Sequence, residues 1–360
     1  MKRPKLAAPP LVAPETWRAL LAAATEFAAL EPWEFACDCD LVGLIDPVSC
    51  ETRIGHELGN AGEVFAAVFY RREGLRWILS MFAEESDPLD ANVADGMDCL
   101  KVEFVPKREL DKDDLAVLKA AAFKPAGRGC VWPQFRSSEP GWHPWYIHQT
   151  EAEQLLADLP RLTAFYRLFE KHTGLFDDRA PTEIPFLPGA LPSRLLTPED
   201  LDWRPLLLLP PVVVEPFRAS ADQLDKLRAF EQKPGLGFEF DCTLVPGGSF
   251  VENGRVCFGR ISLLVERQSG LIAGMNVQSG GLVPGEAAGR GLVETLLMAR
   301  ALPEQIFIAG TRLQPALQPL CDELQIRLQS ASPLPALAEA VAGLNQYMSS
   351  GRLPRMNALG

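Results

Sequence analysis

This 360-residue sequence lacks the features that identify many well-known classes of protein. Basic residues are few: 35 Lys and Arg against 47 Asp and Glu give a net charge of −12. That balance disfavours a protein that holds nucleic acid or an anionic membrane by bulk charge. Long apolar runs are also missing, since the longest, residues 206–214, is too short to cross a bilayer and contains two prolines. We therefore predict a cytoplasmic protein that makes no membrane contact.

The common phosphate-binding, dinucleotide-binding and hydrolase motifs are absent too, so we predict no cofactor and no catalytic residue. The eight cysteines are scattered, and Cys37 and Cys39 form the one close pair. Their C-x-C spacing has no second pair to complete a zinc site, so we predict no metal. On a strand the two thiols would share one face, which favours neighbouring buried thiols. A metal or redox role is the alternative.

Length and proline distribution predict two domains. A chain of 360 residues corresponds to about two domains. Residues 181–216 hold nine of the 31 prolines, which is typical of a connector. We predict a domain over 1–175, a proline-rich connector over 176–218 and a second domain over 219–360. Because positions 1–210 carry a charge of −11 and the rest −1, nucleic acid is a possible partner of the second domain alone.

Apolar periodicity in the first domain predicts an α+β fold with a mostly antiparallel sheet. Thr150 and Glu153 have the spacing of a capping box that begins a long helix. The predicted helices cover residues 17–31, 74–82, 111–123 and 150–171, and the predicted strands cover 41–45, 52–58, 63–70, 98–105, 132–136 and 144–148.

The second domain has the predicted order β-β-β-α-β-α-β-α. Ser220 and Gln223 first cap a short helix. The strands are expected at 238–245, 255–265, 271–278, 305–309 and 326–329, with helices at 286–300, 313–324 and after Ser332. This α/β order over 237–348 resembles the ribonuclease-H-like fold of integrases and transposases. The resemblance is one of topology and spacing.

That resemblance implies carboxylates that hold two divalent ions around a phosphodiester. Asp241 lies in the middle of the first strand, the first long helix offers Glu286 or Glu294, and the last helix offers Glu339. The family also has an Asp at the end of its fourth strand, where this sequence reads Ala309-Gly310. We therefore predict a degenerate, catalytically silent relative of the fold.

The whole chain also resembles an uncharacterised bacterial two-domain family whose members are described as domains of unknown function. Four segments carry this resemblance: Pro-Trp-Glu at 32–34, Gly-Leu-Ile-Asp-Pro at 43–47, Gly-Glu-Val-Phe at 62–65 and the Trp- and Pro-rich run at 132–145. The resemblance implies two domains and supplies no chemistry.

One segment has a composition typical of a protein interface: Arg136, Trp142, His143 and Trp145 lie within ten residues. Trp and Arg often anchor interfaces because they combine apolar area with directional donors. We predict a protein-binding site here, with the alternative that the two Trp rings lock a turn onto the core. The sequence thus favours a non-enzymatic binding or scaffold protein. The alternative is a metal-dependent nuclease or another nucleic-acid-processing enzyme of the ribonuclease-H-like class.

Overall fold

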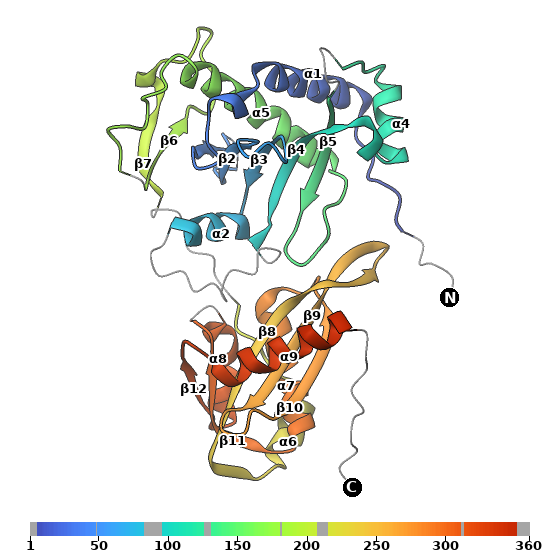
Figure 1. Cartoon of the computed structure of the whole chain (residues 1–360), viewed down its shortest axis with the longest axis vertical. Helices are drawn as coiled ribbons and strands as arrows, with labels where there is room; N and C mark the ends of the chain where they lie inside the picture. The colour runs from blue at the N-terminus through green and yellow to red at the C-terminus, as the bar shows by residue number, and fades with distance from the viewer. Residues whose placement is uncertain are drawn as a thin grey trace. The chain divides into compact units, whose positions relative to one another are not determined.

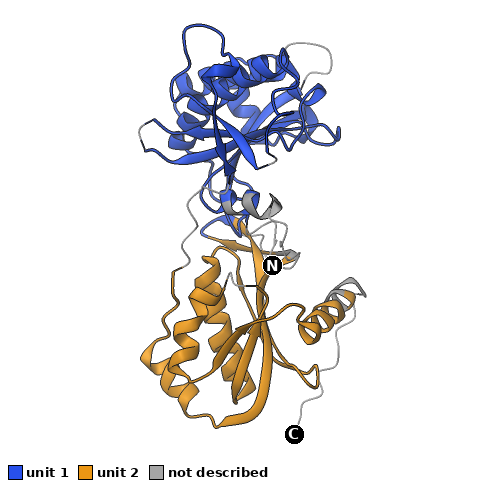
Figure 2. Cartoon of the chain, turned by 90° about the vertical axis from the view of Figure 1, so that its left-hand side faces the viewer, with its two compact units in different colours: residues 1–85, 95–212, 253–255 blue, residues 86–94, 213–252, 256–360 orange. Residues whose placement is uncertain are grey.

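The computed structural model describes residues 6–47, 49–82, 96–125, 131–180, 182–206, 215–310 and 313–350. They form two compact units, coloured separately in Figure 2. The first unit contains the described residues up to 206 together with 253–255, and the second contains the other described residues from 215 onward. Each unit has a mixed sheet and several helices, so the predicted combination of α and β structure is confirmed.

The sheet of the first unit has the strand order β5-β4-β3-β2-β1-β6-β7. Its strands are β1 (Val42–Ile45), β2 (Thr52–Leu58), β3 (Ala66–Tyr70), β4 (Cys99–Pro106), β5 (Val131–Ser138), β6 (Glu183–Leu187) and β7 (Asp202–Pro205). Neighbouring strands are antiparallel except β1 and β6, which are parallel. Side chains alternate along β3: Ala67 and Phe69 enter one core, and Val68 and Tyr70 enter another on the opposite face.

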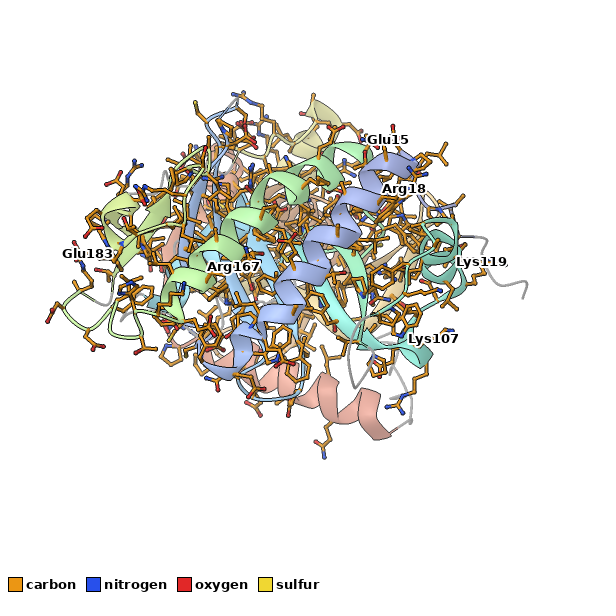
Figure 3. All side chains as sticks on the ribbon, turned by 90° about the horizontal axis from the view of Figure 1, so that it is seen from above. Glu15, Arg18, Lys107, Lys119, Arg167 and Glu183 are labelled. Carbon is orange, nitrogen blue, oxygen red and sulfur yellow. The ribbon has the colours of Figure 1, made fainter. Side chains whose placement is uncertain are left out.

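Two long helices cover one face of this sheet. They are α1 (Pro14–Leu30) and α5 (Gln149–Phe169), and Figure 1 shows both above the strands. Figure 3 shows them side by side, with Arg18 and Arg167 on the outer surface. On the opposite face, α2 (Glu73–Phe82) packs through Leu75 and Ile78. The shorter helices are η1 (Pro32–Glu34), η2 (Lys107–Glu109), α4 (Lys112–Ala120) and η3 (Pro198–Asp200).

A buried network of opposite charges joins α5 to the sheet. Arg53 on β2 donates from Nε to Oδ2 of Asp158 on α5 at 2.5 Å, and from Nη2 to Asp46 at 3.1 Å. Arg161, almost one turn further along α5, lies 3.4 Å from Oδ1 of Asp158 and donates to three backbone carbonyl groups. The three side chains are almost fully buried, so the free-energy cost of burying each charge must be offset by its partners in the network.

The structure differs from the predicted connector at 176–218. Strand β6 pairs with β1, and β7 pairs with β6, so residues 183–205 extend the first sheet. Ile184, Phe186 and Leu206 enter the core beneath α2. The prolines mislead here because both strands contain one: Pro205 lies in the edge strand β7, where a missing N–H donor is tolerated, and Pro185 lies in β6, between β1 and β7. The rest of the apolar run, 207–214, lies outside the described residues.

The second unit has a five-stranded sheet in the order β10-β9-β8-β11-β12. Its strands are β8 (Gln232–Glu252), β9 (Arg255–Glu266), β10 (Ile272–Ser279), β11 (Leu302–Ile308) and β12 (Arg327–Ser330). Strands β9 and β10 are antiparallel, whereas β11 is parallel to both β8 and β12. Asn253 and Gly254 both have positive φ, as is typical of a hairpin turn, and they connect β8 to β9.

Helices cover both faces of this second sheet. The helices are α6 (Ala221–Arg228), α7 (Pro284–Ala299), α8 (Gln314–Glu323) and α9 (Pro335–Ser350). Phe238, Phe240 and Cys242 of β8 share a core with α6, α7 and α8, as their alternation predicts. Helix α9 packs on the other face with Phe307. No helix in the described ranges of either unit combines the length and apolarity needed to span a bilayer.

Three local predictions can be compared with the structure. The Ser220–Gln223 capping box of α6 is confirmed, with both reciprocal hydrogen bonds present. The capping box predicted for α5 at Thr150 and Glu153 is wrong by two residues. The helix begins at Gln149, and the side chain of Glu151 accepts a hydrogen bond from the His148 N–H at 2.9 Å. Residues 144–148 form an isolated bridge rather than a strand, because Trp145 alone pairs with β5.

Candidate functional site

The predicted interface segment lies between β5 and α5, at one end of the first sheet. Its turn is attached to β5 by two backbone hydrogen bonds of 2.8 Å, exchanged between Ser137 and Trp145. Trp142, His143 and Trp145 are each partly exposed. The turn therefore presents these side chains from a fixed backbone, and neither of the two Trp rings is fully buried or fully free.

Arg136 has a different role from the one predicted. Its guanidinium donates to Asp114 at 2.7 and 2.8 Å and to Asp111 at 3.2 Å, and it stacks over the Tyr146 ring at 4.7 Å. Burial opposes ionisation of Asp111, but hydrogen bonds from the Asp114 N–H and the Tyr146 hydroxyl and the charge of Arg136 outweigh it and lower the pKa of Asp111. Arg136 thus holds α4 against β5 and is not a free anchor.

The Trp145 ring packs within the turn, edge-on against the ring of Tyr146, with 5.1 Å between the ring centres. Packing of this kind stabilises a turn as well as a binding surface. The Trp residues thus retain both interpretations that the sequence left open.

A cavity of about 350 Å³ lies next to this segment. Its walls come from the N-terminal segment, α1, α4, β5 and the Tyr146–Ile147 end of the turn that carries Trp142, His143 and Trp145, called the aromatic turn below. Most lining side chains are apolar, including Trp17, Val117 and Phe135, and Asp113 and Tyr146 are among the polar ones. The volume is within the usual range for small-ligand pockets. The Tyr146 hydroxyl lies 3.4 Å from Asp113 but donates a much shorter bond to Asp111.

The acids considered for a nuclease are placed apart or used structurally. Asp241 is half-buried and accepts the N–H of the following residue at 2.8 Å. Glu286 forms an exposed ion pair along its own helix, and Glu339 is exposed on α9. Strand β11 ends at Ile308, and the two described residues directly after it, Ala309 and Gly310, are not acidic. Within the described second unit, no three acids bring ligand oxygens within 4.8 Å of one another.

A cluster of potential metal ligands does occur in the first unit, at the turn before β1. The ligand atoms of Cys37, Asp38 and Cys39 all lie within 4.8 Å of one another. Burial and the neighbouring Cys37 raise the pKa of the Cys39 thiol to about 12, which disfavours a nucleophilic role. Close by on β2, burial raises the pKa of Glu57 to about 7, and the charges of Asp38 and Asp40 add to this rise.

Sequence reasoning identified the aromatic turn and the C-x-C pair but missed the cavity and Glu57. Trp17 lies in the predicted helix 17–31, and Phe135 lies in the predicted strand 132–136. Their meeting with α4 depends on tertiary packing. Glu57 carried no signal, because a single acid in a short strand usually faces water.

The comparisons with known proteins give two domains and no function. Residues 17–185 match a family model described as a domain of unknown function, DUF7309. Residues 223–345 match a second model described in the same way, DUF6930. The chain is therefore built from two domains of uncharacterised type, as its sequence resemblance implied. No curated protein and no solved structure matches this chain.

Proposed function

We propose that this chain is a cytoplasmic binding protein whose ligand site is the cavity of the first unit. The observation that carries the proposal is this 350 Å³ cavity with apolar walls and an acidic edge. Apolar walls with a few placed polar groups are the usual composition of a binding pocket. Much of the wall is contributed by α1, α4 and β5. Arg136 holds α4 against β5, and Trp17 of α1 packs on Phe135 of β5 with 5.5 Å between the ring centres, so the cavity is built on rigid elements.

The lining favours an apolar group that carries a positive charge. Asp111 and Asp114 are both paired with Arg136, whereas Asp113 has a single long contact to Tyr146 in the described structure. A basic group at the cavity edge would pair with Asp113 while its apolar neighbour fills the space beside Trp17. The charge of −11 over residues 1–210 would also draw a basic partner toward this domain. We therefore propose a peptide segment with an apolar side chain next to Lys or Arg.

For the second unit we propose a ribonuclease-H-like domain without nuclease activity. The sheet order β10-β9-β8-β11-β12 supports this proposal. The order along the chain supports it too, because α7 follows β10, α8 follows β11 and α9 follows β12. The missing acid after Ile308 and the separation of the remaining acids argue against two bound ions. Such a domain would serve as a scaffold or a second contact surface.

Display selection tests the binding site directly. A random peptide library is selected on the full chain, and the selected peptides are measured by fluorescence polarisation. We expect sequences with an apolar residue beside Lys or Arg. Ala116 lines the cavity on the exposed side of α4, so Ala116→Trp should fill the space and reduce the affinity by at least tenfold. Ala22→Trp, on the exposed face of α1, is the matched control and should bind normally.

Two results would contradict this proposal. One is unchanged peptide affinity in Ala116→Trp, and the other is equal loss in Ala22→Trp. The nuclease alternative has its own test, in which single- and double-stranded nucleic acids are incubated with Mg²⁺ or Mn²⁺ and the protein. Cleavage that requires the metal and is lost in a stable Asp241→Asn variant would establish the enzyme instead.

A further inference from the structure

The turn between η1 and β1 gathers two sulfurs and a carboxylate. The sulfurs of Cys37 and Cys39 lie 2.9 Å apart, and Oδ1 of Asp38 lies 3.4 Å from the Cys37 sulfur. Asp40 closes the turn, because its Oδ2 accepts the N–H of Cys37 at 2.8 Å and its own N–H donates to the Cys37 carbonyl. Cys37 is partly exposed, and Asp38 and Cys39 are exposed, so an ion in solution can reach all three.

A second observation comes from the strand beside this turn. Glu57 on β2 has a relative exposure of 0 %, and neither carboxylate oxygen has a hydrogen-bond partner among the described residues. Of the buried carboxylates in the described ranges, Glu57 alone has both oxygens unpaired. Burying such a group without a partner is costly, so a positive charge nearby would be favourable. The charges of Asp38 and Asp40 act on Glu57, whose own oxygens lie outside the group of ligand atoms that come within 4.8 Å of one another.

The chemistry of these donors selects the kind of ion. Two thiolates together with carboxylates form a borderline-soft ligand set, which prefers Zn²⁺ and related ions over Mg²⁺ or Ca²⁺. At a Zn–S distance of about 2.3 Å, tetrahedral geometry places two sulfurs about 3.8 Å apart. The sulfurs of Cys37 and Cys39 would need to separate by roughly 1 Å, which rotation of the exposed Cys39 side chain allows.

We infer that the Cys37–Asp38–Cys39 turn binds one zinc-class divalent ion, with both sulfurs and the Asp38 carboxylate as ligands. The site goes beyond the proposed binding function and uses none of the cavity residues. Binding forms metal–sulfur bonds and releases the two thiol protons to solvent, with no oxidation or reduction. The bound ion would offset the negative charge of Asp38 and Asp40 beside the buried Glu57.

The inference is tested on the full chain, treated with a chelator and kept reduced with a phosphine. Co²⁺ is titrated first, because a thiolate ligand produces an ultraviolet charge-transfer band. Zn²⁺ is then added in competition and should remove that band at one ion per chain. Mg²⁺ and Ca²⁺ should not compete. Cys39→Ser should abolish the band, and because Cys39 is exposed its thermal unfolding should be unchanged.

Asp38→Asn, at an exposed position, removes the carboxylate ligand and should weaken Zn²⁺ binding by roughly 10- to 100-fold. The band should remain, because both sulfurs are still present. The matched control is Cys50→Ser, another exposed cysteine of the same unit, which should bind as the unmodified chain does.

Several outcomes would overturn the inference. They are the absence of a saturable band, equal loss in Cys50→Ser, and a disulfide between Cys37 and Cys39 that forms under reducing conditions and excludes metal. If the chain did not bind the metal, the proposal of peptide binding would still stand, because Ala116→Trp tests the cavity and not the Cys37–Asp38–Cys39 turn. Failure of peptide binding would likewise leave the metal titration interpretable.

Discussion

The two units bury charge in different ways. In the first unit, Arg53, Asp158 and Arg161 form a paired network that ties α5 to the sheet. In the second unit, the fully buried Glu239 of β8 accepts the N–H of Leu337 in the first turn of α9 at 2.8 Å. One unit therefore holds a helix across a sheet by ion pairs between buried side chains. The other uses a buried carboxylate at the positive end of a helix dipole, with the partly exposed Arg267 3.5 Å away as its one ion-pair partner among the described residues.

This contrast separates structural charge from candidate functional groups. Asp158 and Glu239 both have partners that explain their burial, so neither needs a ligand. Glu57 has no such partner in the described chain, and Asp113 at the cavity edge has one long contact. Both of these remaining groups belong to the first unit. The comparison therefore directs functional experiments to the first unit and stability experiments to both.

The largest expected effect is in the network of the first unit. Asp158→Ala leaves the buried Arg161 without its carboxylate and Arg53 with Asp46 alone, so unfolding should be easier by about 3–5 kcal/mol. All seven Trp residues lie at or before position 203, so urea unfolding followed by Trp fluorescence reports on this unit selectively. Asp222→Ala, which removes an exposed ion pair on α6, is the control and should not move the fluorescence midpoint. A small effect of Asp158→Ala would mean that the network is not needed.

A smaller effect is expected at the helix cap of the second unit. Glu239→Ala leaves the Leu337 N–H buried without an acceptor, which should cost about 1–3 kcal/mol. Far-ultraviolet circular dichroism should register the loss, while the Trp fluorescence transition of the first unit stays in place. Glu339→Gln, exposed on the same helix, is the matched control. Equal shifts in both signals would show that the two units do not unfold independently.

A pH-dependent effect is expected in the first unit at Glu151. Burial opposes its ionisation, but hydrogen bonds from Ser137 and from the His148 N–H, together with Arg71, outweigh it and lower the pKa of Glu151. The folded state is therefore stabilised by this group above its ordinary pKa of 4.5, and the stabilisation is lost as the pH falls through the lowered value. Urea midpoints between pH 7 and 3 should fall more steeply in the unmodified chain than in Glu151→Gln.

The comparison for this pH series is Glu153→Gln, two residues further along the same helix and exposed. It should reproduce the slope of the unmodified chain below pH 4.5. If Glu151→Gln and Glu153→Gln gave the same slope, the Arg71–Ser137–Glu151 contacts would not be contributing to acid stability.

The smallest effect is expected when the chain is divided. Each unit has its own sheet and its own cores, so fragments 1–206 and 215–360 should both fold. The first fragment ends at Leu206 because that side chain is buried in the core beneath α2. Their urea midpoints should match those of the corresponding transitions in the full chain. A fragment that remains unfolded would contradict this division and favour a boundary nearer the predicted connector at 176–218.

Much of the secondary structure could be predicted because its signals are local. The apolar spacing of Leu20, Leu21, Ala24 and Phe27 predicted α1, and these four side chains are its buried face. The alternation along β8 placed Phe238 and Phe240 correctly on the face under α7 and α8. In each case a period of 3.6 or 2 residues determines which side chains share a face, whatever they pack against.

The candidate sites depended on contacts between distant residues. The composition around Arg136 predicted an exposed anchor, but Asp111 and Asp114 on α4 neutralise it across more than 20 residues of sequence. The C-x-C pair was expected on a strand, whereas a turn brings the two sulfurs together beside Glu57. Spacing alone could not show which acid, helix or strand would lie next to these groups.

The sequence by itself determined the helices, most strands, the two-part organisation and the lack of known catalytic motifs in this protein. These follow from periodicity, capping residues and composition, which act within a few residues of each other. Tertiary structure alone decided that β6 and β7 extend the first sheet and that Arg136 is internally paired. It also decided that the Glu57 carboxylate is buried with no hydrogen-bond partner among the described residues. Strand pairing and burial join residues far apart in the chain, so their outcome depends on the whole packing arrangement and not on any single segment.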